Sequence, residues 1–364
     1  MIVNEVTGLL EELAPLDYAE DFDNVGLLVG DPMAEVSGIL VTLDTLENVV
    51  DEALTKGCNL IISFHPIIFK GLKKITGTSY VERVVLKAIQ NNIAIYSMHT
   101  ALDNSPKGVN AKICEVLGVT KTAILIPQKG SIKKLSTYVP RAEAQTLRQA
   151  LFDAGAGNIG NYSNCSFTSD GTGSYKAGKN ANPTKGVIGK THYEEEVQIN
   201  ITYRKAAESN VLKALFKNHP YEEVAYEIFT LENKDQSIGM GMVGELPNPM
   251  PEEFFLKLIK KNMRAACIRH SGLLGKKIHK VAVLGGSGAF AIGAAINAKA
   301  DIFITADVKY HQFYEAENKL IIADIGHYET EQFTKNVIVD YLTKKIPNFA
   351  ISLSESITNP IKYY

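Results

Sequence analysis

The sequence predicts an α/β fold with parallel-rich sheets, interrupted by an inserted ferredoxin-like domain. In the first and last thirds of the chain, short apolar runs alternate with amphipathic helices, which is typical of βαβ units with helices on both faces of a sheet. The middle third has the order strand, helix, strand, strand, helix, strand, which is the βαββαβ order of a ferredoxin-like domain. We expect one α/β domain formed by residues 1–129 and 234–364, with residues 130–233 inserted in a surface loop.

The N-terminal segment is predicted to alternate helices and strands. In chain order we expect a helix at 4–13, a strand at 39–43, a helix from 44 to 57, a strand at 60–62, a helix at 80–89 and a strand at 93–96. Apolar residues three and four apart give each helix one buried face. Asp44 and Glu47 form a variant of the capping box at the start of the second helix.

The other two segments are read in the same way. In the C-terminal segment we expect strands at 281–284, 301–305 and 320–323, and helices at 289–295, 308–317 and 328–344. In the middle segment we expect strands at 134–139, 197–202 and 223–229, and helices at 142–154 and 206–217. The stretch from Ser169 to Lys185 is rich in Gly, Ser, Asn and Lys, which predicts a mobile loop.

Composition excludes several classes of protein. Lys plus Arg is 38 and Asp plus Glu is 40, so the net charge of −2 gives no support to a nucleic-acid partner. No apolar run approaches the roughly 18 residues of a membrane span, and no basic segment typical of a secretory signal precedes Glu11. The four cysteines are far apart, without a CxxC pair. We therefore expect reduced thiols and a cytoplasmic protein with no membrane partner.

Four side chains that can bind a metal follow the ends of predicted buried strands. His65 follows the strand at 60–62, Asp103 follows the strand at 93–96, and His327 follows the strand at 320–323, with Glu331 one helical turn later. Ligands of open α/β sheets bind at the carboxyl ends of strands. Two imidazoles and two carboxylates suit zinc, iron or manganese. A bridging Glu could hold two ions about 3.5–4 Å apart and so activate water for hydrolysis.

Each of these residues also has a simpler explanation. A single His after a strand is more often a cap or a hydrogen-bonded core residue. Asp103 suits a turn, and Glu331 suits the first turn of a helix because its charge complements the helix dipole. All four at one predicted edge favour the metal site over these separate explanations.

Three further segments allow two interpretations each. Residues 285–288 (GGSG) either cradle a phosphate or form a tight turn between strand and helix. Asp307 either caps a helix or shares a cleft with Lys309 and His311, as substrate ligands or proton-transfer groups. His219 ends a predicted helix, where the dipole alone favours it, and we prefer that explanation to a functional role.

Six segments together carry a family resemblance. They are residues 21–30 (DFDNVGLLVG), 64–70 (FHPIIFK), 99–103 (HTALD), 281–288 (VAVLGGSG), 307–311 (DVKYH) and 326–331 (GHYETE). In this order they make the chain similar to the NIF-three-like family, also called GTP cyclohydrolase type 2 homologues. The resemblance covers both outer segments. The insert, with residues 219–223 (HPYEE), resembles the PII-like or CutA-like domain of the longer bacterial members.

The resemblance implies a two-metal site in a toroidal homohexamer. His65, Asp103 and Glu331 would hold one divalent ion. His327 and Glu331 would hold the other, together with a His at the position that Phe64 occupies here. A phenyl ring cannot ligate, so we expect one or two ions per chain.

The same resemblance implies a function and leaves an alternative open. The implied activity is a metal-dependent hydrolase of GTP cyclohydrolase type, acting on a nucleotide or related heterocycle, with His99 or His311 transferring protons. The alternative is a non-enzymatic protein that senses a metal or a ligand and regulates or engages a partner. The loss of a ligand at Phe64 favours this alternative.

Overall fold

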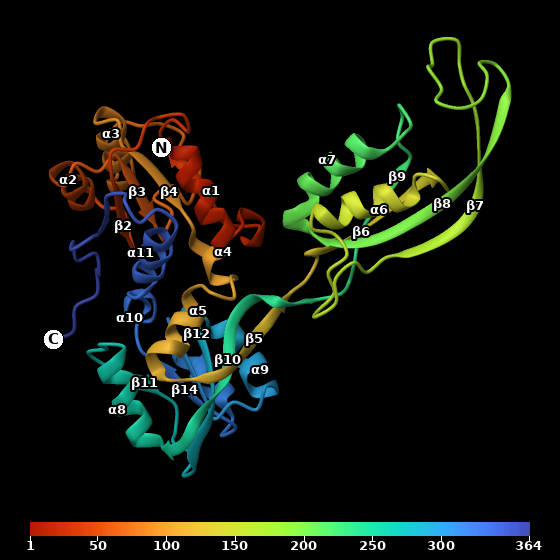
Figure 1. Ribbon diagram of the computed structural model, residues 1–364. Helices are drawn as coiled ribbons and strands as arrows, with labels where there is room; N and C mark the ends of the chain where they lie inside the picture. Colours follow the sequence, from red (N-terminus) through yellow and green to blue (C-terminus); the bar gives the residue numbers. More distant parts are fainter. The chain divides into compact units, whose positions relative to one another are not determined.

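The structure, a computed structural model, describes residues 1–364 and divides into two compact units (Figure 1). The first unit consists of Met1–Pro127 and Gln236–Tyr364, and the second of Gln128–Asp235. The first unit is mixed α/β with two sheets that each contain neighbouring parallel strands. The α/β class and the parallel-rich sheets expected from the sequence are therefore confirmed. None of the helices is long and apolar enough to cross a membrane.

The first sheet of this unit has the strand order β1-β4-β3-β2-β15, with only β1 antiparallel to its neighbour. Its strands are β1 (Gly26–Val29), β2 (Ile39–Thr42), β3 (Leu60–Ser63), β4 (Ala94–Ser97) and β15 (Ile351–Leu353). Alternate strand residues point to opposite faces. Leu40 and Ile61 pack with α2 (Glu47–Thr55) and α3 (Tyr80–Gln90) on one face.

The second sheet has the order β11-β14-β13-β12-β10-β5, in which β12, β13 and β14 are parallel. Its strands are β5 (Thr120–Gln128), β10 (Asp235–Pro251), β11 (Arg269–His270), β12 (Lys277–Ser287), β13 (Ile302–Ala306) and β14 (Ile321–Asp324). One face packs on α9 (Ile292–Asn297) through Ala282 and Phe303.

The inner faces of the two sheets contribute to one hydrophobic core. Ile62 of the first sheet and Ile304 of the second belong to the same buried cluster. The remaining helices of the unit are α1 (Val3–Leu13), α4 (His99–Asp103), α5 (Val109–Leu117), α8 (Glu252–Asn262), α10 (His327–Glu331) and α11 (Thr334–Lys345). This shared core brings the ends of strands from both sheets into one region.

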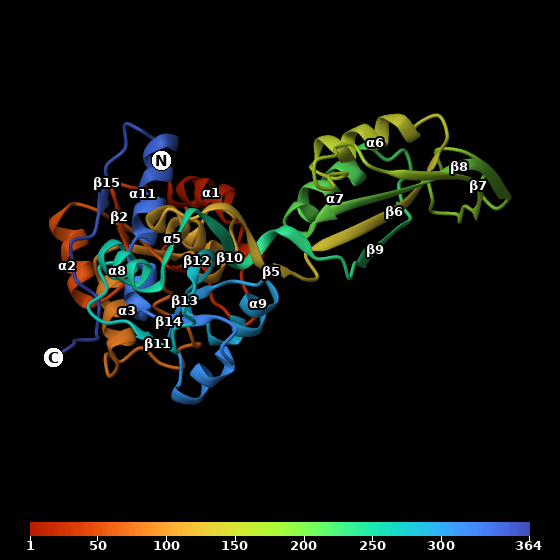
Figure 2. The ribbon, with the colours of Figure 1, turned by 90° about the horizontal axis from the view of Figure 1, so that it is seen from below.

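The second unit is a four-stranded antiparallel sheet with the order β7-β8-β6-β9. Its elements are β6 (Ile132–Pro140), α6 (Ala144–Asp153), β7 (Phe167–Lys176), β8 (Thr191–Arg204), α7 (Glu208–Asn218) and β9 (Tyr226–Thr230). The two helices cover the same face of the sheet (Figure 2), where Leu135, Leu147, Ile199 and Leu215 form a separate core.

Some expected elements differ in the structure. Residues 169–185 were expected to form a loop, but residues 169–176 belong to strand β7. Each of these strand residues pairs with a residue of β8, despite the small polar side chains of the segment. The helix expected over 328–344 is divided into α10 and α11, and the one over 308–317 is a 3-10 helix from Tyr310 to Ala316.

We expect the first unit to fold without the second. Thr120 of β5 lies beside Glu245 of β10, with the Thr120 hydroxyl 3.2 Å from the Glu245 carbonyl oxygen, and the two strands are neighbours in the sheet. Joining Pro127 to Gln236 through a short Gly-Ser linker should therefore give a soluble protein with one cooperative thermal transition, because the two units have separate cores. Calorimetry checks this, and an insoluble product or a broad, non-cooperative transition would contradict it.

Candidate metal centre

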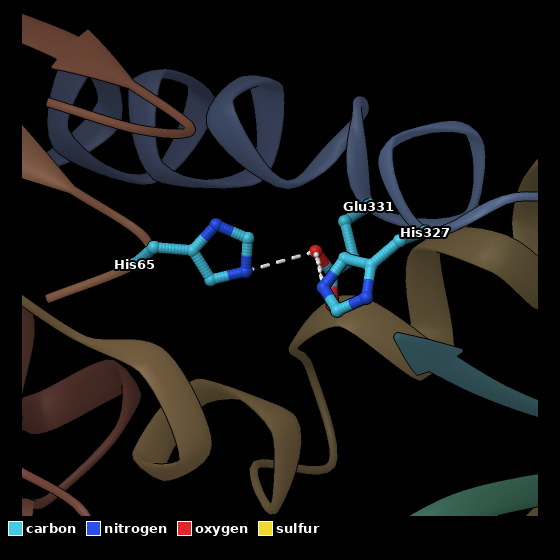
Figure 3. Close-up of side chains that lie close together, drawn as sticks. All are labelled: His65, His327 and Glu331. Carbon is cyan, nitrogen blue, oxygen red and sulfur yellow. Dashed lines mark ion pairs between the residues drawn. The ribbon is translucent and has the colours of Figure 1, made fainter. Parts of the chain in front are cut away.

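Three side chains that can hold a metal ion converge in the first unit, from strand ends of both sheets. His65 follows β3, His327 begins α10 shortly after β14, and Glu331 ends α10. Their ligand atoms all lie within 4.8 Å of one another (Figure 3). Glu331 Oε2 is 3.1 Å from His65 Nε2 and 3.2 Å from His327 Nε2. Ligands about 2.1 Å from a tetrahedral ion are about 3.4 Å apart, so this spacing suits one ion.

A carboxylate holds each of these imidazoles from behind. His65 Nδ1 is 2.7 Å from Asp44 Oδ1, and His327 Nδ1 is 2.7 Å from Asp307 Oδ2. When Nδ1–H donates to the carboxylate, the neutral ring presents the lone pair of Nε2 to the centre. Metal-binding histidines usually have such an outer carboxylate or carbonyl partner, which fixes the ring orientation.

Sequence reasoning missed the role of Asp44. Its spacing from Glu47 indicated a capping box, but α2 begins at Glu47 and its N-cap, Leu46, makes no side-chain cap hydrogen bond. Asp44 instead contacts His65 and accepts a hydrogen bond from Thr358. The available signal was its position directly after a buried parallel strand, the same signal that identified His65.

Asp307 is likewise not a helix cap, since Lys309 holds the N-cap position of the following 3-10 helix. Its backbone has φ of 55°, and its carboxylate accepts a hydrogen bond of 2.5 Å from Ser287 in addition to its contact with His327. The structure therefore pairs Asp307 with His327 and Ser287, and a cleft shared with Lys309 and His311 stays a prediction.

The glycine-rich segment 285–288 shapes the pocket for Glu331. The amides of Gly285 and Gly286 donate to Asn110 Oδ1 and Thr330 Oγ1, so they are not free to cradle a phosphate. A Cβ atom on Gly286 would lie 2.5 Å from Glu331 Oε1. The absence of a side chain at this position lets the carboxylate lie against the backbone of β12.

Replacing Gly286 by alanine should therefore damage the centre. The backbone at Gly286 has φ of +69°, so alanine adds strain of about 1–3 kcal/mol and pushes Glu331 aside. We expect lower stability and weaker zinc binding, measured by urea unfolding and competitive zinc titration. Gly293→Ala is the matched control, because its Cβ would meet nothing within 4 Å in α9. Equal zinc affinity in both variants would show that Gly286 does not position Glu331.

The charges of the centre are strongly coupled. Burial disfavours the charged form of His65, but Glu331 and Asp44 outweigh this and raise its pKa to about 10. Burial acts in the same way on His327, and Glu331 and Asp307 raise its pKa to about 9. Burial alone would raise the pKa of Glu331, but the two imidazoles lower it to about 2. The metal-free centre therefore holds protons where a cation would bind.

Asp103 lies close enough to this group for Glu331 to affect it, although it is not among the three converging ligands. Burial, and then the charge of Glu331, raise the pKa of Asp103 well above its usual range. Asp103 Oδ1 is buried without a hydrogen bond, and Glu331 Oε2 faces the Nε2 atoms of His65 and His327. Buried polar atoms normally have partners. An unsatisfied Asp103 oxygen and a shared Glu331 carboxylate, near two inward-facing imidazoles, therefore fit a bound cation.

The two histidines expected to transfer protons, His99 and His311, have different surroundings in the structure. The rings of His99 and His65 have centroids 5.4 Å apart, and His99 Nδ1 is 2.7 Å from Asp23 Oδ1. Asp23 also accepts hydrogen bonds from the backbone amide and hydroxyl of Thr100. His311 is exposed, and its ring contacts Tyr310 and Tyr314. Geometry thus places His99, and not His311, beside the three converging ligands.

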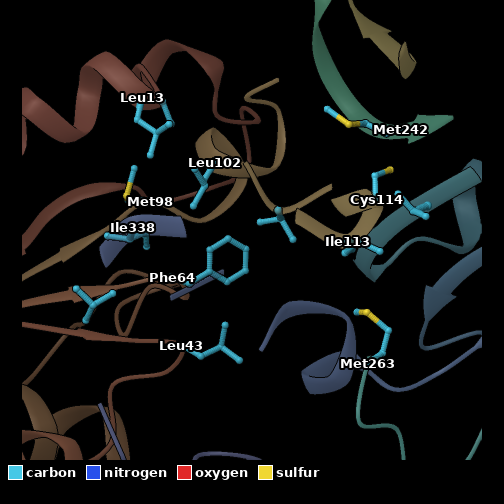
Figure 4. Close-up of a cluster of buried hydrophobic side chains, with 14 of the residues drawn as sticks. Leu13, Leu43, Phe64, Met98, Leu102, Ile113, Cys114, Met242, Met263 and Ile338 are labelled. Atoms are coloured by element: carbon cyan, nitrogen blue, oxygen red, sulfur yellow. The ribbon is translucent and has the colours of Figure 1, made fainter. Parts of the chain in front are cut away.

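Phe64 occupies a fully buried position next to the centre. Its ring packs with Leu43, Met98, Leu102 and Ile338 (Figure 4). The ring centroid is 4.9 Å from that of His65. The side chain preceding His65 is therefore part of the hydrophobic core and also borders the group of ligands.

Comparison with known proteins shows the family of the chain. The family model described as Duf34/NIF3 (NGG1p interacting factor 3) matches residues 1–360. The chain belongs to the Duf34/NIF3 family. The resemblance to the NIF-three-like family found in the sequence is thereby confirmed.

Relatives of similar length lie within the Duf34/NIF3 family. A Bacillus subtilis (strain 168) protein named GTP cyclohydrolase 1 type 2 homolog is 37% identical over 365 residues, covering 99% of this chain and 98% of the relative. A Staphylococcus aureus (strain COL) protein of the same name is 34% identical over 368 residues, covering 100% of both chains. A crystal structure of a Bacillus cereus protein related to NIF3 superposes with a TM-score of 0.83 at 37% identity, covering 100% of this chain and 99% of that one.

Proposed function

We propose that this Duf34/NIF3 protein is a divalent-metal-dependent hydrolase of GTP cyclohydrolase type, acting on a nucleotide or related heterocycle. The observation that carries the proposal is the convergence of His65, His327 and Glu331, with each imidazole held by a further carboxylate. The nitrogen and oxygen donor set suits zinc, iron or manganese. The substrate class rests on the name carried by relatives such as the Bacillus subtilis protein.

The residues of the centre have distinct roles in this proposal. His65, His327 and Glu331 would hold a divalent ion, which would supply Lewis acidity and lower the pKa of water. Asp103, with its unsatisfied buried oxygen, is the further ligand. Asp44 and Asp307 fix the ring orientations of the two histidines. His99, oriented by Asp23, presents its remaining ring nitrogen for proton transfer.

The assembly and the second unit complete the proposal. We propose a homohexamer, as the family resemblance implies, and an inserted ferredoxin-like domain formed by the second unit. Its element order β6-α6-β7-β8-α7-β9 and its antiparallel strand order β7-β8-β6-β9 support that assignment. Sedimentation at equilibrium would test the oligomer, and a monomer at every concentration would contradict it.

The hydrolase proposal is tested with protein loaded separately with zinc, iron or manganese and mixed with GTP and other nucleotides. We expect one metal form to turn over a nucleotide, followed as a change in the purine absorbance, and a chelator to abolish this. Glu331→Gln should lack the activity. Equal turnover rates with and without the chelator would contradict the hydrolase proposal. The absence of turnover by every metal form would also contradict it.

Phe64 favours a second candidate, a non-enzymatic protein that senses a metal or ligand, because it replaces one ligand of the two-ion site that the family resemblance implies. Replacing Phe64 by histidine should add that ligand and increase the metal content per chain. The metal-free variant should lose about 1–3 kcal/mol of stability, since an imidazole is buried in an apolar core. Elemental analysis of both proteins measures the change.

Phe64→Leu is the control for this experiment, because it alters the core without adding a ligand. If metal content rises only in Phe64→His and hydrolysis appears or increases with it, the hydrolase proposal gains over the sensing one. Unchanged metal content in both variants would show that position 64 does not face the ions.

A further inference from the structure

The second unit contains a cavity of about 650 Å³ on the face of its sheet that α6 and α7 do not cover. Glu196 and Gln198 line it, and they alternate along β8 with Val197 and Ile199, which lie in the core under the helices. Tyr138, Tyr175 and Tyr221 also line it. Its volume is within the range of sites for small molecules. The function proposed for the first unit makes no use of this cavity.

The segment 219–223, which the sequence singled out, builds one wall of the cavity. His219 follows α7 and is only 8% exposed. Its Nε2 lies 3.0 Å from the carbonyl oxygen of Tyr138, and its Nδ1 accepts a hydrogen bond of 3.2 Å from the backbone amide of Tyr221. The helix dipole alone therefore does not explain His219. The ring joins the two chain segments that carry two of the three tyrosines.

Glu196 differs from its neighbours in having no basic partner. Glu194 pairs with Lys185, and Glu195 lies 3.8 Å from Arg141. Glu196 instead accepts a hydrogen bond of 2.8 Å from the Tyr221 hydroxyl. Its carboxylate lies over Gly173 of β7, where an added Cβ would be 2.1 Å from Glu196 Oε2. The glycine thus makes room for a carboxylate that is held in place without a counter-ion.

Two features give the cavity its charge and its closure. Asp170, Glu222 and Glu223 line it together with Glu196, whereas Lys176 is the one basic residue of the lining. The segment between β7 and β8 is held against residues 220–222 by two hydrogen bonds. The amide of Asn182 donates to the Glu222 carboxylate, and the Thr184 hydroxyl donates to the Pro220 carbonyl oxygen.

We propose that this cavity binds a small organic cation through an ammonium group. Aromatic rings attract a cation at their faces, more strongly when it is removed from water, and an unpaired carboxylate supplies the opposite charge. Tyr175 and Tyr221 have ring centroids 5.9 Å apart in an edge-to-face arrangement. Such a pair beside Glu196 selects a positive charge over a neutral group of equal shape. His219 is a positioning residue for Tyr138 and Tyr221.

The test is calorimetric titration of the full chain with choline, with spermidine and with 3,3-dimethyl-1-butanol, the neutral isostere of choline. We expect at least one cation to bind, and the neutral isostere to bind at least about tenfold more weakly than choline or not at all. Equal affinity for choline and its isostere would overturn the proposal. Failure of both cations to bind at concentrations up to about 10 mM would also overturn it.

Variants locate the binding. Glu196→Gln and Gly173→Ala should each weaken binding of the cation about tenfold or more. Glu195→Gln, the matched control on the opposite face of β8, should bind normally, as should Glu331→Gln in the first unit. Melting temperatures show whether each variant is folded. Binding that is unchanged in folded Glu196→Gln, or lost equally in Glu195→Gln, would contradict the assignment.

Discussion

Replacing Glu331 by glutamine should reduce zinc affinity by about a hundredfold or more. The Glu331 carboxylate is the group that both His65 and His327 approach, at 3.1 and 3.2 Å. Glutamine has nearly the same shape but no charge, so the centre loses its shared anionic ligand. The two imidazoles also lose the carboxylate that raises their pKa values. Competitive titration with a chromophoric chelator measures the change.

Glu329→Gln is the matched control for this substitution. Glu329 lies in the same short helix and is 6% exposed, but its carboxylate accepts a hydrogen bond from Asn359. We expect the zinc affinity of Glu329→Gln to stay within a few fold of the zinc affinity of the unmodified protein. If Glu329→Gln and Glu331→Gln weaken zinc binding equally, the effect belongs to the helix and not to a ligand.

Zinc binding should release about two protons per ion from the two imidazoles near neutral pH, because metal ligands must be deprotonated. The pKa values of about 10 for His65 and about 9 for His327 mean that both rings are protonated before the ion arrives. The apparent affinity should then rise about a hundredfold per pH unit and level off as pH passes through these pKa values. Titration in buffers of different ionisation enthalpy counts the protons. Release of no protons would contradict the assigned ligands.

The same pKa values predict how pH affects the metal-free protein. Both folded-state pKa values are raised above the usual 6.5 of histidine. The imidazolium–carboxylate contacts therefore contribute their full stability below about pH 6.5, and this contribution is lost as pH rises through 9 and 10. We expect the melting temperature of metal-free protein to fall over that range more than that of Glu331→Gln, in which the contacts with Glu331 are already lost and only those with Asp44 and Asp307 remain.

The central parallel strands of the first unit could be predicted from the sequence, whereas β1, β10 and β15 were not predicted. The apolar run at 60–62 corresponds to β3, and the run at 320–323 to β14. Parallel strands buried on both faces are continuous apolar runs, and such runs stand out in a sequence. The same logic placed His65 and His327 at strand ends, because their positions depend only on local structure.

The strand-end positions predicted that the ligands share one edge, but these local patterns could not show that two different sheets supply them. His65 follows a strand of one sheet and His327 follows a strand of the other, and only the shared core of the two sheets brings these strand ends together. Asp44 shows the same difficulty. An aspartate after a strand can cap a helix or hold a histidine, and the long-range contact with His65 decides between them.

The second unit shows where composition misleads. Gly171 and Gly173 made residues 169–185 resemble a loop, yet both lie within β7. Gly173 is required there because Glu196 of the neighbouring strand lies over it. His219 was explained by its helix end alone, although its two ring nitrogens contact Tyr138 and Tyr221. In both cases a cross-strand or cross-loop contact sets the residue type.

Anomalous diffraction at the zinc absorption edge, from crystals grown with zinc, tests the central claim most directly. The account predicts a peak within about 2.0–2.2 Å of His65 Nε2, His327 Nε2 and an oxygen of Glu331. A second peak nearby would identify a two-ion site. No peak among these three side chains, with zinc bound elsewhere or not at all, would contradict the account.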